Sequence, residues 1–158
     1  MATQTTYSER IAPPSPGTVA GQMDNARSTT GICETASPGI PFGRAVSQGV
    51  LSSEGVILGG AAATFRGVSI KDQTLRGDGA IVDAYLPPNG VGVLESGDIW
   101  VEPSVAVAVN DPVYFEPTTG VFRNILDTDG IIVNRARFKT ACGVGGRAIL
   151  SLAGGRNA

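Results

Sequence analysis

The residue types that most often carry out chemistry in proteins are scarce in this sequence. None of its 158 residues is His, which removes the commonest general acid–base catalyst, His-based triads and most catalytic zinc sites. Cys33 and Cys142 are the only cysteines and cannot supply the four ligands of a structural zinc site. In a reducing compartment we expect two buried thiols rather than a disulfide. We therefore predict no metal site and no cofactor.

Two short motifs resemble ligand-binding loops without their essential residues. The stretch GVGGR at 143–147 is glycine-rich like a phosphate loop, but it lacks the Gly-Lys-Ser/Thr ending and precedes a strand instead of a helix. The stretch LDTDG at 126–130 begins like a calcium loop, but the later ligands and the bidentate Glu are missing. We interpret the first as a hairpin connection and the second as a tight turn.

Catalysis by other groups receives little support. A Ser–Lys dyad is formally possible, but neither Lys71 nor Lys139 lies in a nucleophile motif. Pairs of carboxylates for glycoside hydrolysis come from distant positions, so a sequence does not reveal them. The single Trp, Trp100, provides little material for a sugar-binding platform. We predict that the protein is not an enzyme and has no catalytic residues.

The charge balance excludes one class of partner and favours another. Twelve basic residues face 14 acidic ones, for a net charge of −2, which argues against nucleic-acid binding. Only 16% of residues are charged, below the usual quarter or so, and we expect part of the remaining surface to be a protein interface. Ten of the 12 basic residues are Arg. Arg is favoured at interfaces, although a GC-rich coding bias gives the same enrichment.

The first 27 residues differ from the rest of the chain. They contain no apolar run typical of a secretory signal, and no window of the whole sequence has the 18 or so apolar residues of a membrane span. The stretch APPSP, with Pro13, Pro14 and Pro16, favours extended polyproline geometry. Residues 1–27 are therefore either a disordered tail or an extended arm that becomes ordered along a neighbouring subunit. We expect a protein that does not enter membranes and is made in a cytoplasm.

From residue 28 onward the sequence predicts a single β domain, residues 28–158. Its 22 Gly and 10 Pro across the whole chain indicate many turns, and no amphipathic helix is apparent. Short stretches with strand composition alternate with turns, which is typical of a β-sandwich, a jelly roll or a barrel-like fold. The predicted strands lie at 28–34, 42–47, 55–60, 64–71, 91–96, 98–103, 104–110, 112–116, 120–124, 131–134, 135–142 and 147–153.

Two of these strands have a clear period of two. In SVAVAVN, residues 104–110, Val and Ala alternate, which predicts one large and one small face. In RARFKTAC, residues 135–142, one face carries Arg135, Arg137 and Lys139, here called the basic stripe. The opposite face is mostly apolar and should pair with residues 147–153. The basic stripe is either a solvated face that blocks edge-to-edge aggregation or a patch for an acidic partner.

Two segments carry a resemblance to a known family. The first is GDIWVEPSVAVAVNDPVYFEPTTGVF, residues 97–122, and the second is PGIPFGRAVSQG, residues 38–49. The sequence resembles the structural cement, or head-decoration, proteins of tailed bacteriophages, over about residues 35 to 125. Asn110-Asp111 stands where Gly-Asp is commoner in that family, and Asn also tolerates turn geometry.

The resemblance implies a β-sandwich or jelly-roll-like protein on the exterior of an assembled capsid. Such a protein contacts several subunits of the major capsid protein, resists internal pressure and usually forms dimers or trimers. The implied location is the virion, after synthesis in the host cytoplasm. The residues that we predict for the capsid or oligomer interface are Tyr7, Arg10, Pro13, Pro14, Pro16, Arg135, Arg137 and Lys139.

Two alternatives from other classes remain open at this stage. The first is a virion-associated carbohydrate-binding or fibre-attachment module, because jelly rolls commonly bind sugars. The second is a small hydrolase or lyase that uses acidic residues, which would need two facing carboxylates in a wet pocket.

Overall fold

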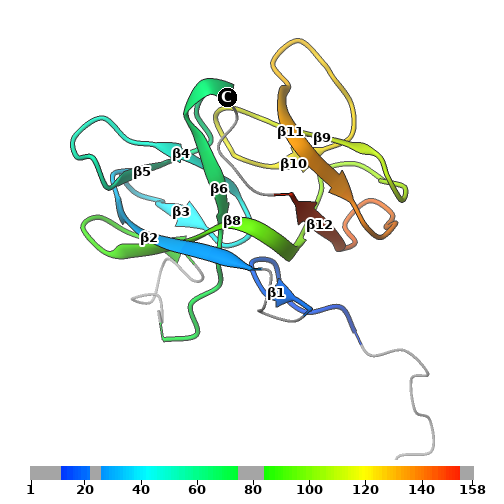
Figure 1. The fold of residues 1–158 in the computed structure, drawn as a ribbon, viewed down its shortest axis with the longest axis horizontal. Coiled ribbons are helices and arrows are strands. Elements are labelled where there is room, and N and C mark those ends of the chain that lie inside the picture. Colours follow the sequence, from blue (N-terminus) through cyan, green and yellow to red (C-terminus); the bar gives the residue numbers. More distant parts are fainter. Residues whose placement is uncertain (1–11, 22–25, 75–83, 154–158) are drawn as a thin grey trace, which may run out of the picture.

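The computed structural model describes residues 12–21, 26–74 and 84–153. Within these ranges the chain forms twelve strands and one 3₁₀ turn, Ala62–Thr64, and no α-helix (Figure 1). The predicted all-β class is therefore confirmed. The strands are β1 Val19–Ala20, β2 Arg27–Cys33, β3 Ile40–Pro41, β4 Ala45–Gln48, β5 Gly55–Leu58, β6 Phe65–Ser69, β7 Ala84–Tyr85, β8 Gly90–Val101, β9 Pro112–Phe115, β10 Phe122–Arg123, β11 Ile131–Phe138 and β12 Ala148–Leu152.

Most of the strands belong to one large sheet in the order β10-β9-β11-β12-β8-β2-β5-β4-β6, and β1 also pairs with β8. Because β6 pairs with β8 as well, strands β8, β2, β5, β4 and β6 close into a ring. The β2–β5 pair is parallel, and β3 and β7 form a separate two-stranded sheet. This half of the molecule is thus barrel-like, whereas jelly-roll connectivity stays a prediction.

The long strand β8 connects the two halves of the molecule. Its first part pairs with β2 and β6, and its last part pairs with β12 and β1. The exchange of partners occurs at Gly97, which has φ +117° and lies so close to Ala26 that an added Cβ would be 3.1 Å from the Ala26 Cα atom. The sequence predicted two strands broken at Gly97. The structure instead has one strand that passes through this residue, because Gly tolerates the positive φ.

The segment 104–110 forms no strand, contrary to the prediction from its alternating Val and Ala residues. It contributes only an isolated bridge between Val107 and Cys142. Asn110 has φ +69°, and an Asp111 carboxylate oxygen accepts the backbone N–H of Ala108 at 2.8 Å. Val109 is consequently 55% exposed. The side chain of Asp111 satisfies a backbone donor that a sheet would otherwise use, so the turn begins earlier than the pattern indicated.

Both predicted hairpins are present. In the first, Phe122 of β10 pairs with Phe115 of β9, and Gly120 has φ +64° at the turn. In the second, β11 pairs with β12, and the inner face of β12 is buried as the sequence predicted. Arg135 has φ +60° within a register shift of β11, which is typical of a β-bulge.

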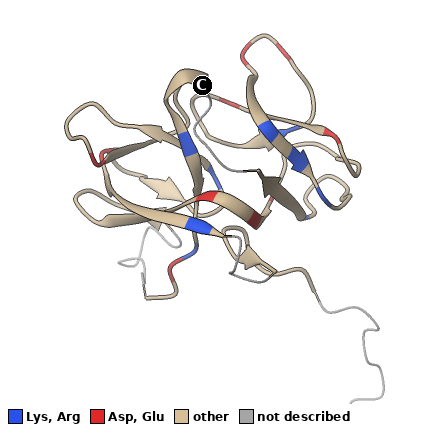
Figure 2. Cartoon of the chain, in the orientation of Figure 1, with Lys and Arg blue, Asp and Glu red and all other residues tan. Residues whose placement is uncertain are grey.

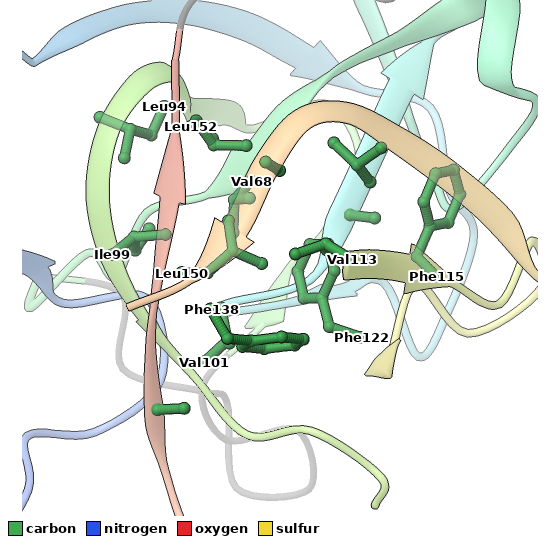
Figure 3. Packing of buried hydrophobic residues seen from close by; sticks show 14 of the residues in the cluster. Val68, Leu94, Ile99, Val101, Val113, Phe115, Phe122, Phe138, Leu150 and Leu152 are labelled. Atoms are coloured by element: carbon green, nitrogen blue, oxygen red, sulfur yellow. The ribbon is translucent and has the colours of Figure 1, made fainter. Parts of the chain in front are cut away.

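The two halves have separate hydrophobic cores. The larger core lies between β6, β8, β9, β10, β11 and β12, and Figure 3 shows its side chains converging from these strands. In it the rings of Phe65 and Phe115 are 5.5 Å apart. The smaller core includes Phe42 and Tyr85, whose rings meet edge to face at 5.2 Å. Burial of each large apolar side chain stabilises the fold by about 1.5–3 kcal/mol, so the two cores hold the surface loops on a rigid frame.

Candidate interaction surfaces

The basic stripe is exposed, but its charges are not equally available. Figure 2 shows basic residues along β11. Lys139 Nζ donates a hydrogen bond to Asp98 Oδ2 at 2.6 Å, and Arg137 Nη1 donates to the carbonyl oxygen of Ala136 at 2.9 Å. Among the described residues, Arg135 and Arg137 form no ion pair. The stripe therefore presents two uncompensated guanidinium groups and one lysine that is already paired.

The electrostatics of Asp98 follow from this ion pair. Partial burial raises the pKa of Asp98, but the hydrogen bonds from Lys139 and Ser151 and the positive charge of Lys139 outweigh it, so the pKa lies below its usual value. The lysine is 61% exposed in its side chain and the aspartate 21%. A pair this accessible to water contributes less than about 1 kcal/mol to stability.

The segment 12–21 lies against the β domain. The backbone N–H of Gly17 donates to the carbonyl oxygen of Trp100 at 2.8 Å, and the N–H of Trp100 donates to Thr18 at 2.9 Å. Strand β1 extends this contact by pairing with β8. The sequence indicated neither helix nor strand before residue 28, because two residues are too few to show a periodic pattern.

The prolines of this segment are anchored through their backbone. Arg147 Nη1 lies 2.8 Å from the carbonyl oxygen of Pro13 and 3.2 Å from that of Pro14, while both proline side chains are exposed and Pro16 is half-buried. Tyr7 and Arg10, the other predicted contact residues of the arm, lie outside the described residues. The division into an arm of residues 1–27 and a domain of residues 28–158 stays a prediction, as does the role of these residues at an interface.

Sequence reasoning missed a set of exposed aliphatic side chains. Two adjacent pairs lie in loops: Val50 and Leu51 between β4 and β5, which are 89% and 82% exposed, and Ile125 and Leu126 between β10 and β11, which are 54% and 66% exposed. The β4–β5 loop and the β10–β11 loop lie toward opposite ends of the long axis of the molecule (Figure 1). Two adjacent aliphatic residues within a Gly-, Ser- or Asp-rich turn were the only signal that could have identified them.

The carboxylate of Glu34 holds the β4–β5 loop through hydrogen bonds with its backbone. Glu34 accepts the backbone N–H groups of Val50, Leu51 and Ser52 at distances of 2.8 to 3.1 Å. Consecutive backbone N–H groups that converge on one anion form a compact and well-defined loop. Gln48 adds to this arrangement, because its Nε2 lies 3.1 Å from the carbonyl oxygens of Ser52, Ser53 and Gly55 and donates to two of them at a time.

Arg66 is a buried cation that the sequence did not single out. It is 7% exposed, and its Nη2 lies 3.5 Å from Thr29 Oγ1. The Nε and Nη1 atoms have no hydrogen-bond partner among the described residues. An added Cβ on Gly31 would be 3.4 Å from Nη1, so the guanidinium lies beneath β2. Arg66 thus adds nothing to the exposed cationic surface.

The two cysteine side chains are unreactive thiols. Cys33 and Cys142 are both free thiols, and burial is the main cause that raises the pKa of each, which keeps them protonated near neutral pH. Cys33 is buried as predicted, whereas Cys142 is only half-buried.

The described residues contain no group of three or more Cys, Asp or Glu that could hold a metal ion. No helix in this part of the chain is long and apolar enough to cross a membrane.

The two loop-like motifs are turns, as predicted. In the first, the N–H of Gly146 donates to Gly143 at 3.0 Å, and the loop joins β11 to β12. In the second, the N–H of Asp129 lies 3.3 Å from Asp127 Oδ1, and Asp127 forms an ion pair with Arg123.

Comparison with protein families assigns the chain to one family. The model of the family described as structural cement protein (E217 gp24/Pam3 gp6) matches residues 3–153, nearly the whole sequence. The chain belongs to this family. Family membership confirms the resemblance found in the sequence and gives the protein a structural, capsid-stabilising role in a bacteriophage.

Comparison with solved structures agrees at the level of the fold. A chain from the structure entitled "The capsid of Myoviridae Phage XM1" superposes with a TM-score of 0.71 at 16% sequence identity, covering 97% of this cement protein and 98% of that chain. The same architecture is therefore shared over essentially the full length at low identity. Comparison with curated protein sequences gives no match.

Proposed function

We propose that this cement protein binds the outer surface of the assembled major-capsid lattice and stabilises the head by bridging neighbouring capsid subunits. The observation that carries the proposal is the match of the cement family over residues 3–153. A cement protein that touches more than one subunit gains affinity through multivalency, because the first contact raises the effective concentration for the next.

The distribution of apolar side chains supports a bridging role. The Val50–Leu51 pair and the Ile125–Leu126 pair are exposed in loops toward opposite ends of the molecule. The frame between them is one continuous hydrogen-bonded sheet, so the two loops keep a constant separation. A rigid body with a contact point at each end is suited to spanning two subunits of a lattice.

Further parts of the proposal concern the partners and location of the protein. We expect it to form a dimer or trimer on the capsid exterior after synthesis in the host cytoplasm, with no enzymatic activity and no nucleic-acid partner. The part of the N-terminal segment that the structure describes is anchored by Arg147 at the carbonyl oxygens of Pro13 and Pro14. In this proposal the arm of residues 1–27 contacts a neighbouring subunit, and Tyr7 and Arg10 are among its contact residues.

A sedimentation experiment tests the proposal. Purified protein is mixed with expanded capsids of its own phage that were assembled without it, and the pelleted fraction is measured by quantitative gel analysis. We expect saturable binding at a stoichiometry set by the lattice symmetry, together with a higher thermal disruption temperature of the capsids. A protein that stays in the supernatant at all concentrations would contradict the proposal. Deleting the arm of residues 1–27 should reduce capsid occupancy, and unchanged occupancy and capsid stability would show that the arm does not contribute to binding.

A further inference from the structure

The β4–β5 loop exposes its two most apolar residues to water, which is unfavourable in free energy. Val50 and Leu51 are 89% and 82% exposed, the two highest values among the exposed large hydrophobic residues of the described chain. Single exposed apolar residues are common on protein surfaces. Two adjacent ones in a surface loop, here called the Val50–Leu51 tip, are unusual unless something covers them.

The backbone beneath this tip is fixed in one conformation. The Glu34 carboxylate accepts N–H groups from three successive residues, Val50 to Ser52. The carboxylate fits between Gly49 and Gly55, where an added Cβ would lie 2.2 Å and 1.7 Å from a Glu34 oxygen. The loop is also closed by the N–H of Gly49, which donates to the carbonyl oxygen of Gly55 at 2.8 Å. A loop that is already ordered loses less conformational entropy when it binds.

We propose that the Val50–Leu51 tip is a preorganised anchor that inserts into an apolar pocket of the major capsid protein, and that Glu34 is its positioning residue. This inference rests on the proposed function, since it names the contact by which the protein would hold the lattice. Both side chains of the tip are almost fully exposed, so the partner has to supply an apolar surface that covers them.

The size of the tip distinguishes the capsid from a second copy of the chain. At about 25 cal/mol per Å², burial of an aliphatic side chain corresponds to roughly 60–120 Å² of apolar area. Two such side chains fall far below the 800 Å² or so per partner that a stable dimer buries. A contact this small is effective only as one of several made at the same time, which is the situation of a protein on a repeating lattice.

The charges around the tip argue against a lipid surface. The loop from Gln48 to Gly55 contains no Lys or Arg, and its one charged residue is Glu54, which is exposed. Glu34 adds a second carboxylate beneath the tip. Anionic lipid headgroups attract basic segments and repel acidic ones, whereas an apolar protein pocket requires no cationic rim.

The test compares matched pairs of substitutions in a capsid-binding experiment. The probe is the expanded capsid of the same phage assembled without this protein. The double variant V50S/L51S removes the tip, and V109S/V144S is the control, because it removes two aliphatic side chains in other loops that are 55% and 78% exposed. Both variants should keep the far-UV spectrum and thermal midpoint of the wild type, since the altered side chains are exposed.

The inference requires a loss of at least about tenfold in affinity for V50S/L51S, because burial of each side chain accounts for roughly that factor. It also requires a smaller loss for V109S/V144S. Binding of V50S/L51S within twofold of the wild type, or a loss no larger than that of the control, would overturn the inference. Absence of binding by the wild type itself would instead show that the proposed function is wrong.

The role of Glu34 is tested by a double-mutant cycle. E34Q replaces a carboxylate oxygen by a nitrogen that cannot accept an N–H group. If Glu34 acts by positioning the tip, E34Q weakens capsid binding several-fold in the native sequence but has little effect in the V50S/L51S background. Equal effects in both backgrounds would show that Glu34 acts only on general stability and would overturn its assignment as a positioning residue.

Discussion

The β4–β5 loop and the basic stripe on β11 are two exposed regions with opposite chemistry. The loop presents Val50 and Leu51 on a backbone held by Glu34. The stripe presents cations, but Lys139 already donates a hydrogen bond to Asp98. Arg137 donates a hydrogen bond to the carbonyl oxygen of Ala136. The structure thus organises the apolar loop for contact more thoroughly than it organises the charged strand.

The difference between these two regions shows that a side chain can be exposed and still be unavailable for a new contact. Charged residues are easy to notice in a sequence, yet an exposed charge that is already paired contributes little to a new interface. An aliphatic pair in a glycine-rich turn attracts little notice, yet a preordered apolar tip releases water on binding at a low entropic cost. Measurements of capsid binding and of stability on matched variants test this contrast.

The largest effect is expected from Leu51→Asp. A carboxylate carried into an apolar pocket without a partner loses its hydration and gains nothing in return, so affinity for the capsid should fall at least about a hundredfold, or about 2.7 kcal/mol. Stability should not change, because the side chain is 82% exposed. Sedimentation with capsids measures the loss, and Val144→Asp at a 78% exposed position serves as the control. Similar losses for both variants would mean that the β4–β5 loop has no special role.

A smaller effect, dependent on salt, is expected from the double variant R135A/R137A. If the stripe faces an acidic part of the capsid, two exposed ion pairs are lost and affinity should fall between about twofold and tenfold. The loss should shrink as ionic strength rises from about 0.01 to 0.15 M, because the Debye length falls from about 30 to 8 Å. The Leu51→Asp loss should not vary in this way. Capsid binding measured across this salt range decides between the two behaviours, and an unchanged affinity would leave the stripe as a solvated face.

The smallest effect concerns the paired end of the stripe. The pKa of Asp98 is lower in the folded protein than its ordinary value, so the stabilising contribution of its charge is complete above the unfolded pKa of about 3.9. It is lost as the pH falls through the folded pKa. The variant D98N should therefore lose less than about 1 kcal/mol of unfolding free energy near neutral pH. It should lose nothing at a pH below both pKa values, where Asp98 is protonated.

Urea unfolding between about pH 2 and pH 7 measures this contribution, with wild type and D98N compared at each pH. Ser151→Ala provides a matched control, because it removes another hydrogen bond to Asp98 and leaves the Lys139 pair intact. A difference between wild type and D98N that stays constant over this range would show that the carboxylate charge is not its source.

Much of the fold could be predicted because its strongest patterns are local. The β9–β10 and β11–β12 hairpins follow from short apolar runs separated by turn residues, and in both the pairing agrees with the structure. The segment 104–110 shows the limit of this reasoning. Its Val and Ala residues alternate as in a strand, but the Asp111 side chain accepts the N–H of Ala108 and turns the chain. Such competition between side chain and backbone depends on three-dimensional geometry rather than on periodicity.

The candidate sites were less predictable than the fold. The stripe Arg135, Arg137 and Lys139 was identified from its spacing and is exposed as expected, but its partner Asp98 is far away in the sequence. The loop of Val50 and Leu51 was missed because Glu34, which holds it, belongs to the connection after β2 and not to the loop itself. Contacts between segments this distant leave no local pattern in a single sequence.

By itself the sequence determined the composition-level properties of this protein. These are an all-β fold rich in turns, the lack of His-based chemistry, a low charge density and a resemblance to phage cement proteins, since each depends on residue types and short spacings. Only the tertiary structure decided which exposed groups are already paired and which remain available. That decision depends on long-range contacts, such as Glu34 with the β4–β5 loop, Lys139 with Asp98 and Arg147 with the backbone of Pro13, which form only when the closed ring and the β11–β12 hairpin bring distant segments together.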